Sequence, residues 1–84
     1  MPVWKLTPTD LSDPAWSASK HRGGAIVRAA SEGAARRISA AAFQASEEAQ
    51  AGAPWTDPVL VRAEEVQDPQ YDPKGRSEVL DLVA

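Results

Sequence analysis

The chain contains no cysteine and only one histidine, and these two scarcities exclude several kinds of chemistry. Without cysteine there is no disulfide framework, no thiolate nucleophile and no cysteine-ligated zinc or iron–sulfur site. A single imidazole cannot build a multi-histidine metal site, and His21 lies in the segment Lys20-His21-Arg22 before two glycines, as is typical of an exposed loop histidine. We therefore expect a protein without a metal or a cofactor.

Large apolar side chains are also scarce. Alanine supplies 16 of the 84 residues, whereas Leu, Ile, Val and Phe together supply 15, or about 18%. So low a fraction favours disorder, but the formal net charge of only −3 argues against it. We expect one folded domain over residues 1–84, with a thin core.

Long apolar runs are absent, since none reaches 10 residues, and no charged segment followed by an apolar one opens the sequence. We therefore expect neither a membrane span nor a signal peptide, and the lack of cysteine fits a cytoplasmic protein. Neither a P-loop nor a nucleophile elbow is present. These absences predict a protein that is not an enzyme and has no small-molecule substrate.

The residues that are present predict a small α/β domain of the α+β type, built in two layers. Strands are expected over residues 3–6, 25–29, 59–66 and 77–83, and a helix over residues 31–50. This order predicts a three- or four-stranded, mainly antiparallel sheet with one amphipathic, alanine-rich helix across one face. Residues 1–22 are expected to form an edge strand and an irregular arm, and residues 23–84 a β-α-β-β core that closes with a hairpin.

The predicted helix has an alanine face. Ser31 is the expected N-cap, with Glu32 in the first turn. With Ile38 at the centre of the buried arc, six alanines lie within about 60° of it, at positions 34, 35, 41, 42, 45 and 49. Phe43 lies about 140° from that centre, so we expect its ring to point away from the sheet.

Four of the seven prolines follow an aspartate, at positions 13–14, 57–58, 68–69 and 72–73. Proline keeps the preceding residue out of the α region, and an aspartate side chain accepts hydrogen bonds from nearby backbone N–H groups. We interpret each Asp-Pro pair as a turn.

The aromatic residues suggest a binding surface. Large aromatics and arginines are the usual anchors of protein interfaces. The candidates for protein contact are therefore Phe43, Trp16, Trp55, Arg36 and Arg37. The alternative is that the arm folds back, so that tryptophans cover Phe43 or fill the volume that an alanine-faced helix leaves.

The charges are unevenly distributed. Residues 1–42 carry a net charge of +3, whereas residues 43–84 carry −6. The two halves can pair within one molecule, or the same asymmetry can drive self-association. The basic cluster around Arg22 and Arg36 is the only candidate for direct nucleic-acid binding, and a sequence pI near 5.0 argues against it.

Four segments carry a resemblance: residues 4–8 (WKLTP), the Asp13-Pro14-x-Trp16 arm, residues 26–36, and Pro54-Trp55. They resemble a family of short uncharacterised bacterial proteins. In size and topology the chain is also similar to small phage anti-CRISPR proteins, which implies an inhibitor that binds a CRISPR surveillance complex and blocks its nucleic-acid binding. Our first hypothesis is a non-enzymatic protein-binding module. The alternatives are such an inhibitor and a self-associating accessory subunit.

Overall fold

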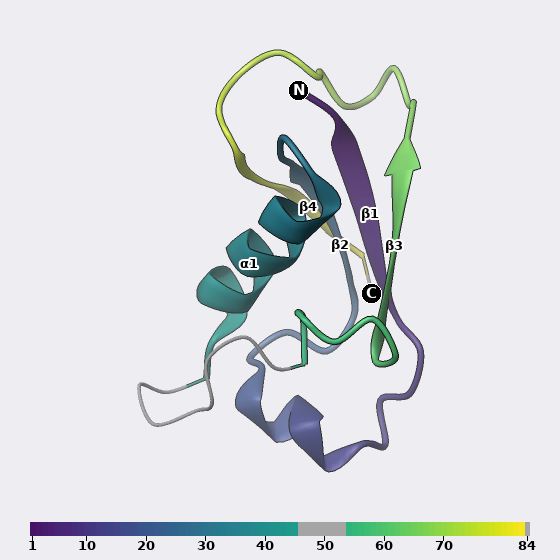
Figure 1. The fold of residues 1–84 in the computed structure, drawn as a ribbon, viewed down its shortest axis with the longest axis vertical. Helices are drawn as coiled ribbons and strands as arrows, with labels where there is room; N and C mark the ends of the chain where they lie inside the picture. Colours follow the sequence, from purple (N-terminus) through teal and green to yellow (C-terminus); the bar gives the residue numbers. More distant parts are fainter. Residues whose placement is uncertain (46–53, 84) are drawn as a thin grey trace.

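A computed structural model shows one four-stranded antiparallel sheet with one α-helix across one face (Figure 1). It describes residues 1–45 and 54–83. The elements are β1 (Val3–Pro8), a 3-10 helix (Pro14–Ala18), β2 (Gly24–Arg28), α1 (Glu32–Phe43), β3 (Val61–Val66) and β4 (Glu78–Val83). This confirms the predicted fold class and the predicted order of elements.

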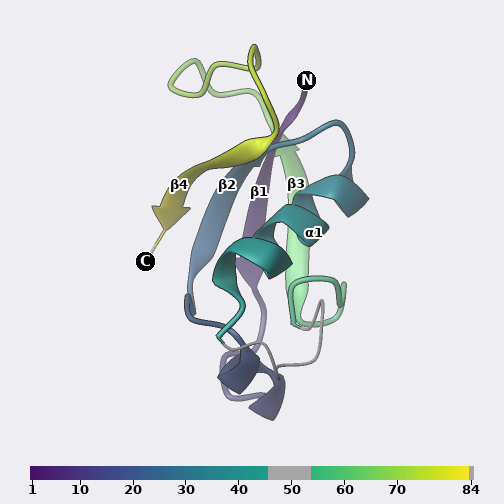
Figure 2. The ribbon, with the colours of Figure 1, turned by 90° about the vertical axis from the view of Figure 1, so that its left-hand side faces the viewer.

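The strand order β3-β1-β2-β4 corrects two expectations. The first strand was expected at an edge but is central: Val3 is in register with Arg28 of β2 on one side and with Val66 of β3 on the other. The last two strands were expected to form a hairpin but lie at opposite edges. Because β1 pairs with both β2 and β3, the chain must cross the sheet between β3 and β4, and it does so in a crossover loop, residues 67–77 (Figure 2).

The helix begins as expected and ends early. The Ser31 hydroxyl caps it by accepting a hydrogen bond from the Ala34 N–H at 3.1 Å. It ends at Phe43, where the arm supplies the next hydrogen bonds: the Lys20 N–H donates to the Phe43 carbonyl at 2.7 Å, and the Ala45 N–H donates to the Ala18 carbonyl at 2.9 Å. Most of the predicted extension to residue 50 lies outside the described residues.

The predicted buried face of the helix was wrong by about one residue, or 100° of rotation. The residues that α1 buries are Ala35, Arg36, Ser39 and Phe43, whereas Ala41 and Ala42 are exposed. Phe43, expected on the outside, is only 8% exposed. This face could not be recognised in the sequence because two of its residues, Arg36 and Ser39, are polar. Ser39 can be fully buried because its hydroxyl donates to the Ala35 carbonyl at 3.0 Å.

The four Asp-Pro pairs are turns, as predicted. Each aspartate carboxylate accepts a hydrogen bond from the backbone N–H two residues further on, at 2.8 to 2.9 Å. One of them, Asp13, caps the 3-10 helix that carries Trp16. The arm is therefore more regular than expected, and it carries a tryptophan into the core below the helix.

Arg28 fastens the crossover loop to the sheet. Its guanidinium donates to the backbone carbonyls of Asp72 and Arg76, both at 2.8 Å, and forms a salt bridge with Glu78 at 2.9 Å. Arg28 is 7% exposed, so the loop covers this end of the face that α1 leaves open. The remainder of that face is only partly open, since Ile26 at its centre is 4% exposed.

Candidate protein-binding surface

The predicted aromatic contact residues form an internal cluster. Trp16 and Trp55 pack edge to face with ring centroids 5.4 Å apart, and Phe43 lies 5.0 Å from Trp55. Both tryptophans are 1% exposed. The structure thus supports the alternative in which the arm folds back and tryptophans fill the volume beside the helix.

His21 belongs to the same cluster. Its ring is half-buried, 5.1 Å from Phe43 and stacked on Trp55 at 6.4 Å, and its Nε2 lies 2.8 Å from the Gly24 carbonyl. The Trp55 indole N–H donates to Ser19 Oγ at 3.0 Å, and that hydroxyl donates to the His21 carbonyl at 2.6 Å. The histidine is a packing residue, which its position beside two glycines did not reveal.

Arg36 is a structural clamp, while its neighbour Arg37 is exposed. The Arg36 Nη1 donates to the Val61 carbonyl at 2.7 Å and to the Trp55 carbonyl at 3.3 Å, and its Nε pairs with Glu32 at 3.2 Å. It is 7% exposed. Arg36 thereby holds the segment before β3 against α1, in the same way that Arg28 holds the crossover loop.

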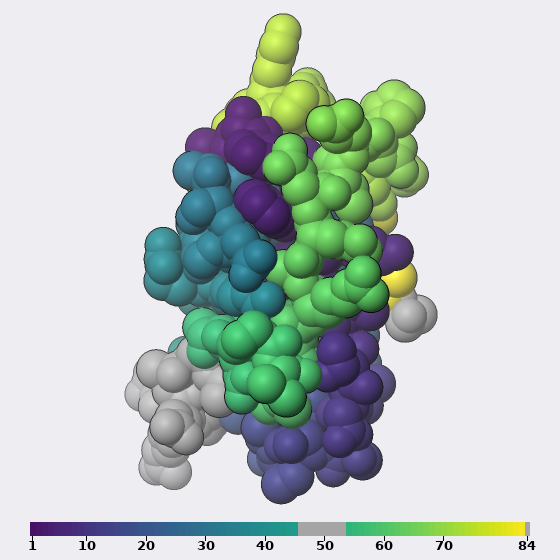
Figure 3. All heavy atoms as spheres, turned by 45° about the vertical axis from the view of Figure 1, so that its right-hand side comes forward, coloured from purple at the N-terminus to yellow at the C-terminus, as the bar shows by residue number. Residues whose placement is uncertain are grey.

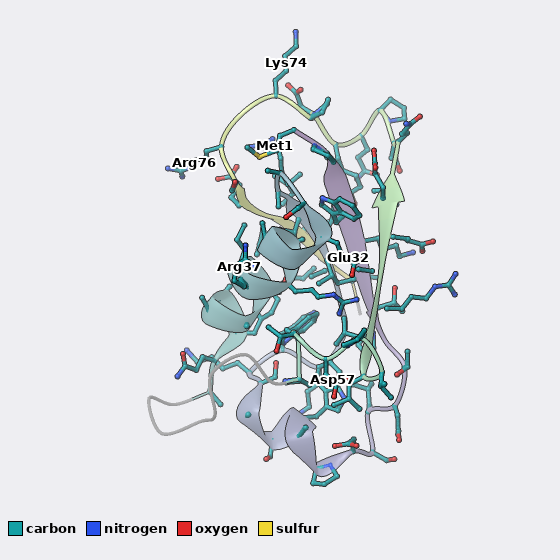
Figure 4. All side chains as sticks on the ribbon, in the orientation of Figure 1. Met1, Glu32, Arg37, Asp57, Lys74 and Arg76 are labelled. Atoms are coloured by element: carbon teal, nitrogen blue, oxygen red, sulfur yellow. The ribbon has the colours of Figure 1, made fainter. Side chains whose placement is uncertain are left out.

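Of the five predicted contact residues, only Arg37 lies on the surface (Figure 4). Phe43, Trp16, Trp55 and Arg36 are interior and offer little area to a partner. Whether the chain binds a protein stays a prediction, but its surface must be sought elsewhere: on the open sheet face, on the strand edges and beside the crossover loop.

The open sheet face is built of three cross-strand rows. The rows are Val66, Val3, Arg28 and Glu78; then Glu64, Lys5, Ile26 and Asp81; then Arg62, Thr7, Gly24 and Val83. The crossover loop covers the first row, and the third borders a hollow of about 260 Å³ lined by Lys5, Arg22 and Leu11. The loop therefore covers one end of this face, and the arm residues Arg22 and Leu11 border the other end.

The two edges of the sheet differ in character. β3 exposes the charged side chains of Arg62, Glu64 and Glu65. β4 contains four aliphatic residues out of six, and Leu82 is 53% exposed. Among the described residues, β4 has a hydrogen-bonded neighbour on one side only. An aliphatic edge without lysine or proline is a ready acceptor for a further strand.

A groove of about 740 Å³ opens where residues 1–3, the end of β3 and the crossover loop meet (Figure 3). Val3, Val66 and Tyr71 contribute apolar surface, and three prolines line it as well. Three carboxylates, of Glu65, Asp68 and Asp72, also line it. The residues of the groove come from the start of the chain and from the end of β3 with the loop after it. The groove could therefore be recognised only once the strand order was known.

Two titratable groups of this region have shifted pKa values. The hydroxyl of Tyr71 donates to Asp81 at 2.9 Å; this hydrogen bond, together with the negative charges of Asp81 and Asp68, raises the pKa of Tyr71 above its ordinary 10.0. The hydrogen bond from Arg76, with a further contribution from Arg28, lowers the pKa of Glu78. The crossover loop is thus anchored to β4 through both a tyrosine and a carboxylate.

Comparison with protein-family models, with curated proteins and with solved structures gives no match. The resemblances drawn from the sequence therefore stay predictions. Within residues 1–45 and 54–83, no helix has the length and apolar character needed to cross a membrane. In the same residues, no three histidine or carboxylate side chains converge as metal ligands would.

Proposed function

We propose that this chain is a protein-binding module that accepts an extended segment of its partner along the edge of β4. The single observation that supports the proposal is the open aliphatic edge of this strand, with Leu82 53% exposed. In strand addition, unpaired main-chain groups of an edge supply affinity and alternate side chains supply specificity.

The contrast between the edges favours β4 over β3. Exposed charges are a common device that keeps an edge from pairing, and β3 carries three of them. On β4 the exposed charge is Asp81, and its carboxylate is already engaged by Tyr71. The backbone N–H of Leu82 is engaged as well, because it donates to the Asp81 carboxylate at 2.9 Å. The aliphatic side chains along the edge remain for a partner strand.

The proposed partner is another protein. The alternatives remain a second copy of the chain and, for an inhibitor of anti-CRISPR type, a subunit of a CRISPR surveillance complex. All three use the same edge, so one experiment separates them by the identity of what is bound there.

The test is site-specific photocrosslinking in cells of the organism of origin. Leu82 is replaced by benzoylphenylalanine in the full chain, and Val59, which is 77% exposed beside the β3 edge, receives the same replacement as a matched control. We expect one defined polypeptide adduct from position 82 and none from position 59. An adduct with a second copy would establish self-association, and one with a surveillance-complex subunit would establish the inhibitor.

A second variant shows whether the adduct depends on the edge. Leu82→Lys places a charge on β4 and should abolish copurification of the cross-linked protein, whereas Val59→Lys should retain it. Thermal denaturation of both variants verifies that they remain folded. Equal adducts from the two positions, adducts from neither, or copurification that survives Leu82→Lys would refute the proposal.

A further inference from the structure

The groove beside the crossover loop has features that β4 lacks. It is concave, its volume of about 740 Å³ lies within the range of ligand sites, and its apolar lining includes the partly exposed Val66 and Tyr71. The ring of Tyr71 is held in place because its hydroxyl bonds to Asp81. A groove with a fixed wall loses little conformational entropy when it binds.

The charge of the groove defines what it accepts. Three carboxylates line it, and the only cationic group among the lining residues is the amino terminus of Met1. None of the three carboxylates forms a salt bridge within the described chain, and every lysine and arginine of the sequence belongs to those residues. No lysine or arginine of the protein therefore pairs with these carboxylates.

The cations nearest along the chain are directed elsewhere. Lys74 projects from the crossover loop away from the fold, and Arg76 pairs with Glu78 at 3.0 Å (Figure 4). Arg28 is occupied by two loop carbonyls and by Glu78. An anionic ligand such as a nucleic-acid phosphate would be repelled here, whereas a cation would gain both charge pairing and contact with an aromatic face.

We propose that this groove binds a short polypeptide segment in which lysine or arginine flanks an apolar residue. The apolar residue rests against Val66 and Tyr71, and the cationic side chains reach the carboxylates of Glu65, Asp68 and Asp72. The occupant belongs to another protein, and the site is distinct from the β4 edge.

The probe is the blocked pentapeptide acetyl-Gly-Arg-Leu-Arg-Gly-amide, titrated into the full ¹⁵N-labelled chain. We expect saturable chemical-shift changes at residues 65–73 and at Val3. The matched peptide acetyl-Gly-Glu-Leu-Glu-Gly-amide should produce none. Affinity should fall as salt is added, because the contributing charges are exposed.

Matched variants test the carboxylates. Asp68→Asn with Asp72→Asn removes two charges yet keeps the oxygens that accept the loop N–H bonds. Asp13→Asn with Asp57→Asn removes two charges from identical Asp-Pro turns outside the groove. The first pair should weaken peptide binding roughly three- to tenfold and the second less than about twofold.

Four results would overturn the proposal. One is the absence of saturable shifts at millimolar peptide, another is equal weakening by the two pairs of variants, and the third is concentration-dependent shifts of the groove amides without peptide, which would make a second copy the occupant. Shifts confined to β4 would also overturn it while leaving the proposed edge binding intact, so the two proposals fail separately.

Discussion

Gly75 lies directly against the guanidinium of Arg28. A Cβ built on Gly75 would be 2.6 Å from Nη2 of Arg28 and 2.9 Å from its Cζ, and the φ angle of Gly75 is +125°. The contact explains how an arginine from β2 can be enclosed by a loop that comes from the far edge of the sheet. The glycine gives the loop the backbone conformation and the close approach that the clamp needs.

Gly75→Ala should therefore destabilise the fold. The added methyl group meets the clamp and forces a side chain into a φ region that only glycine tolerates, at a cost of about 2 kcal/mol in the free energy of unfolding. Urea denaturation measures it. Gly33→Ala is the control, since it faces only the flexible end of Arg37 and should gain about 0.5 kcal/mol from helix propensity. Equal effects of the two changes would contradict the role assigned to Gly75.

Substitutions of the sequence neighbours Arg36 and Arg37 should differ sharply in their effect on the free energy of unfolding. Arg36→Met leaves the carbonyls of Trp55 and Val61 without their charged donor, and we expect a loss of about 2 kcal/mol in the free energy of unfolding. Arg37→Met removes an exposed side chain and should change stability by less than about 0.5 kcal/mol. Denaturant titration of the two variants gives the comparison, and similar losses would rule out the clamp.

Phe43→Ala should be a core mutation. The ring contacts His21 and Trp55 and is 8% exposed, so its loss opens a cavity and costs about 3 kcal/mol in the free energy of unfolding. The same denaturation experiment measures it, with Ala42→Ser on the exposed face of α1 as the control. An unchanged denaturation midpoint for Phe43→Ala would contradict the core position of the ring and agree with the exposed position expected from the sequence.

The pKa of Tyr71 can be measured directly, because it is the only tyrosine in the chain. Absorbance of the phenolate near 295 nm should titrate above pH 10.0 in the native protein and move back toward that value in Asp81→Ala. The folded pKa is raised, so this contact stabilises the fold below pH 10.0 and is lost as the pH rises through the raised pKa. A midpoint that Asp81→Ala leaves in place would exclude Asp81 as the cause.

The parts of the fold that local chemistry determines could be predicted from the sequence. Ser31 at the start of the helix and the four Asp-Pro turns each depend on hydrogen bonds within a few residues. The strand order could not be predicted, since it depends on pairings such as Val3 with Val66 that lie far apart in the chain. A hairpin was the natural expectation for two strands joined by turn residues, because sequential strands usually pair.

Four of the five predicted contact residues are buried, and the reason is related. Hydrophobic periodicity treats arginine and serine as outward-facing, yet Arg36 and Ser39 are buried because backbone carbonyls satisfy their polar groups. The helix orientation that buries Arg36 and Ser39 also places Phe43 in the core. The aromatic residues predicted as contacts lie in the core. The groove and the β4 edge became visible only once the strand order was known.

The central position of β1 has a consequence for how the chain matures during translation. During synthesis β1 can pair with β2 once residue 28 has been added, but its other partner, β3, is complete only at residue 66. Until then the nascent sheet has an unpaired flank and lacks Val61, so no shorter unit has the full core. Any fragment that stops before β3 is therefore expected to aggregate and to be a substrate for chaperones and proteases.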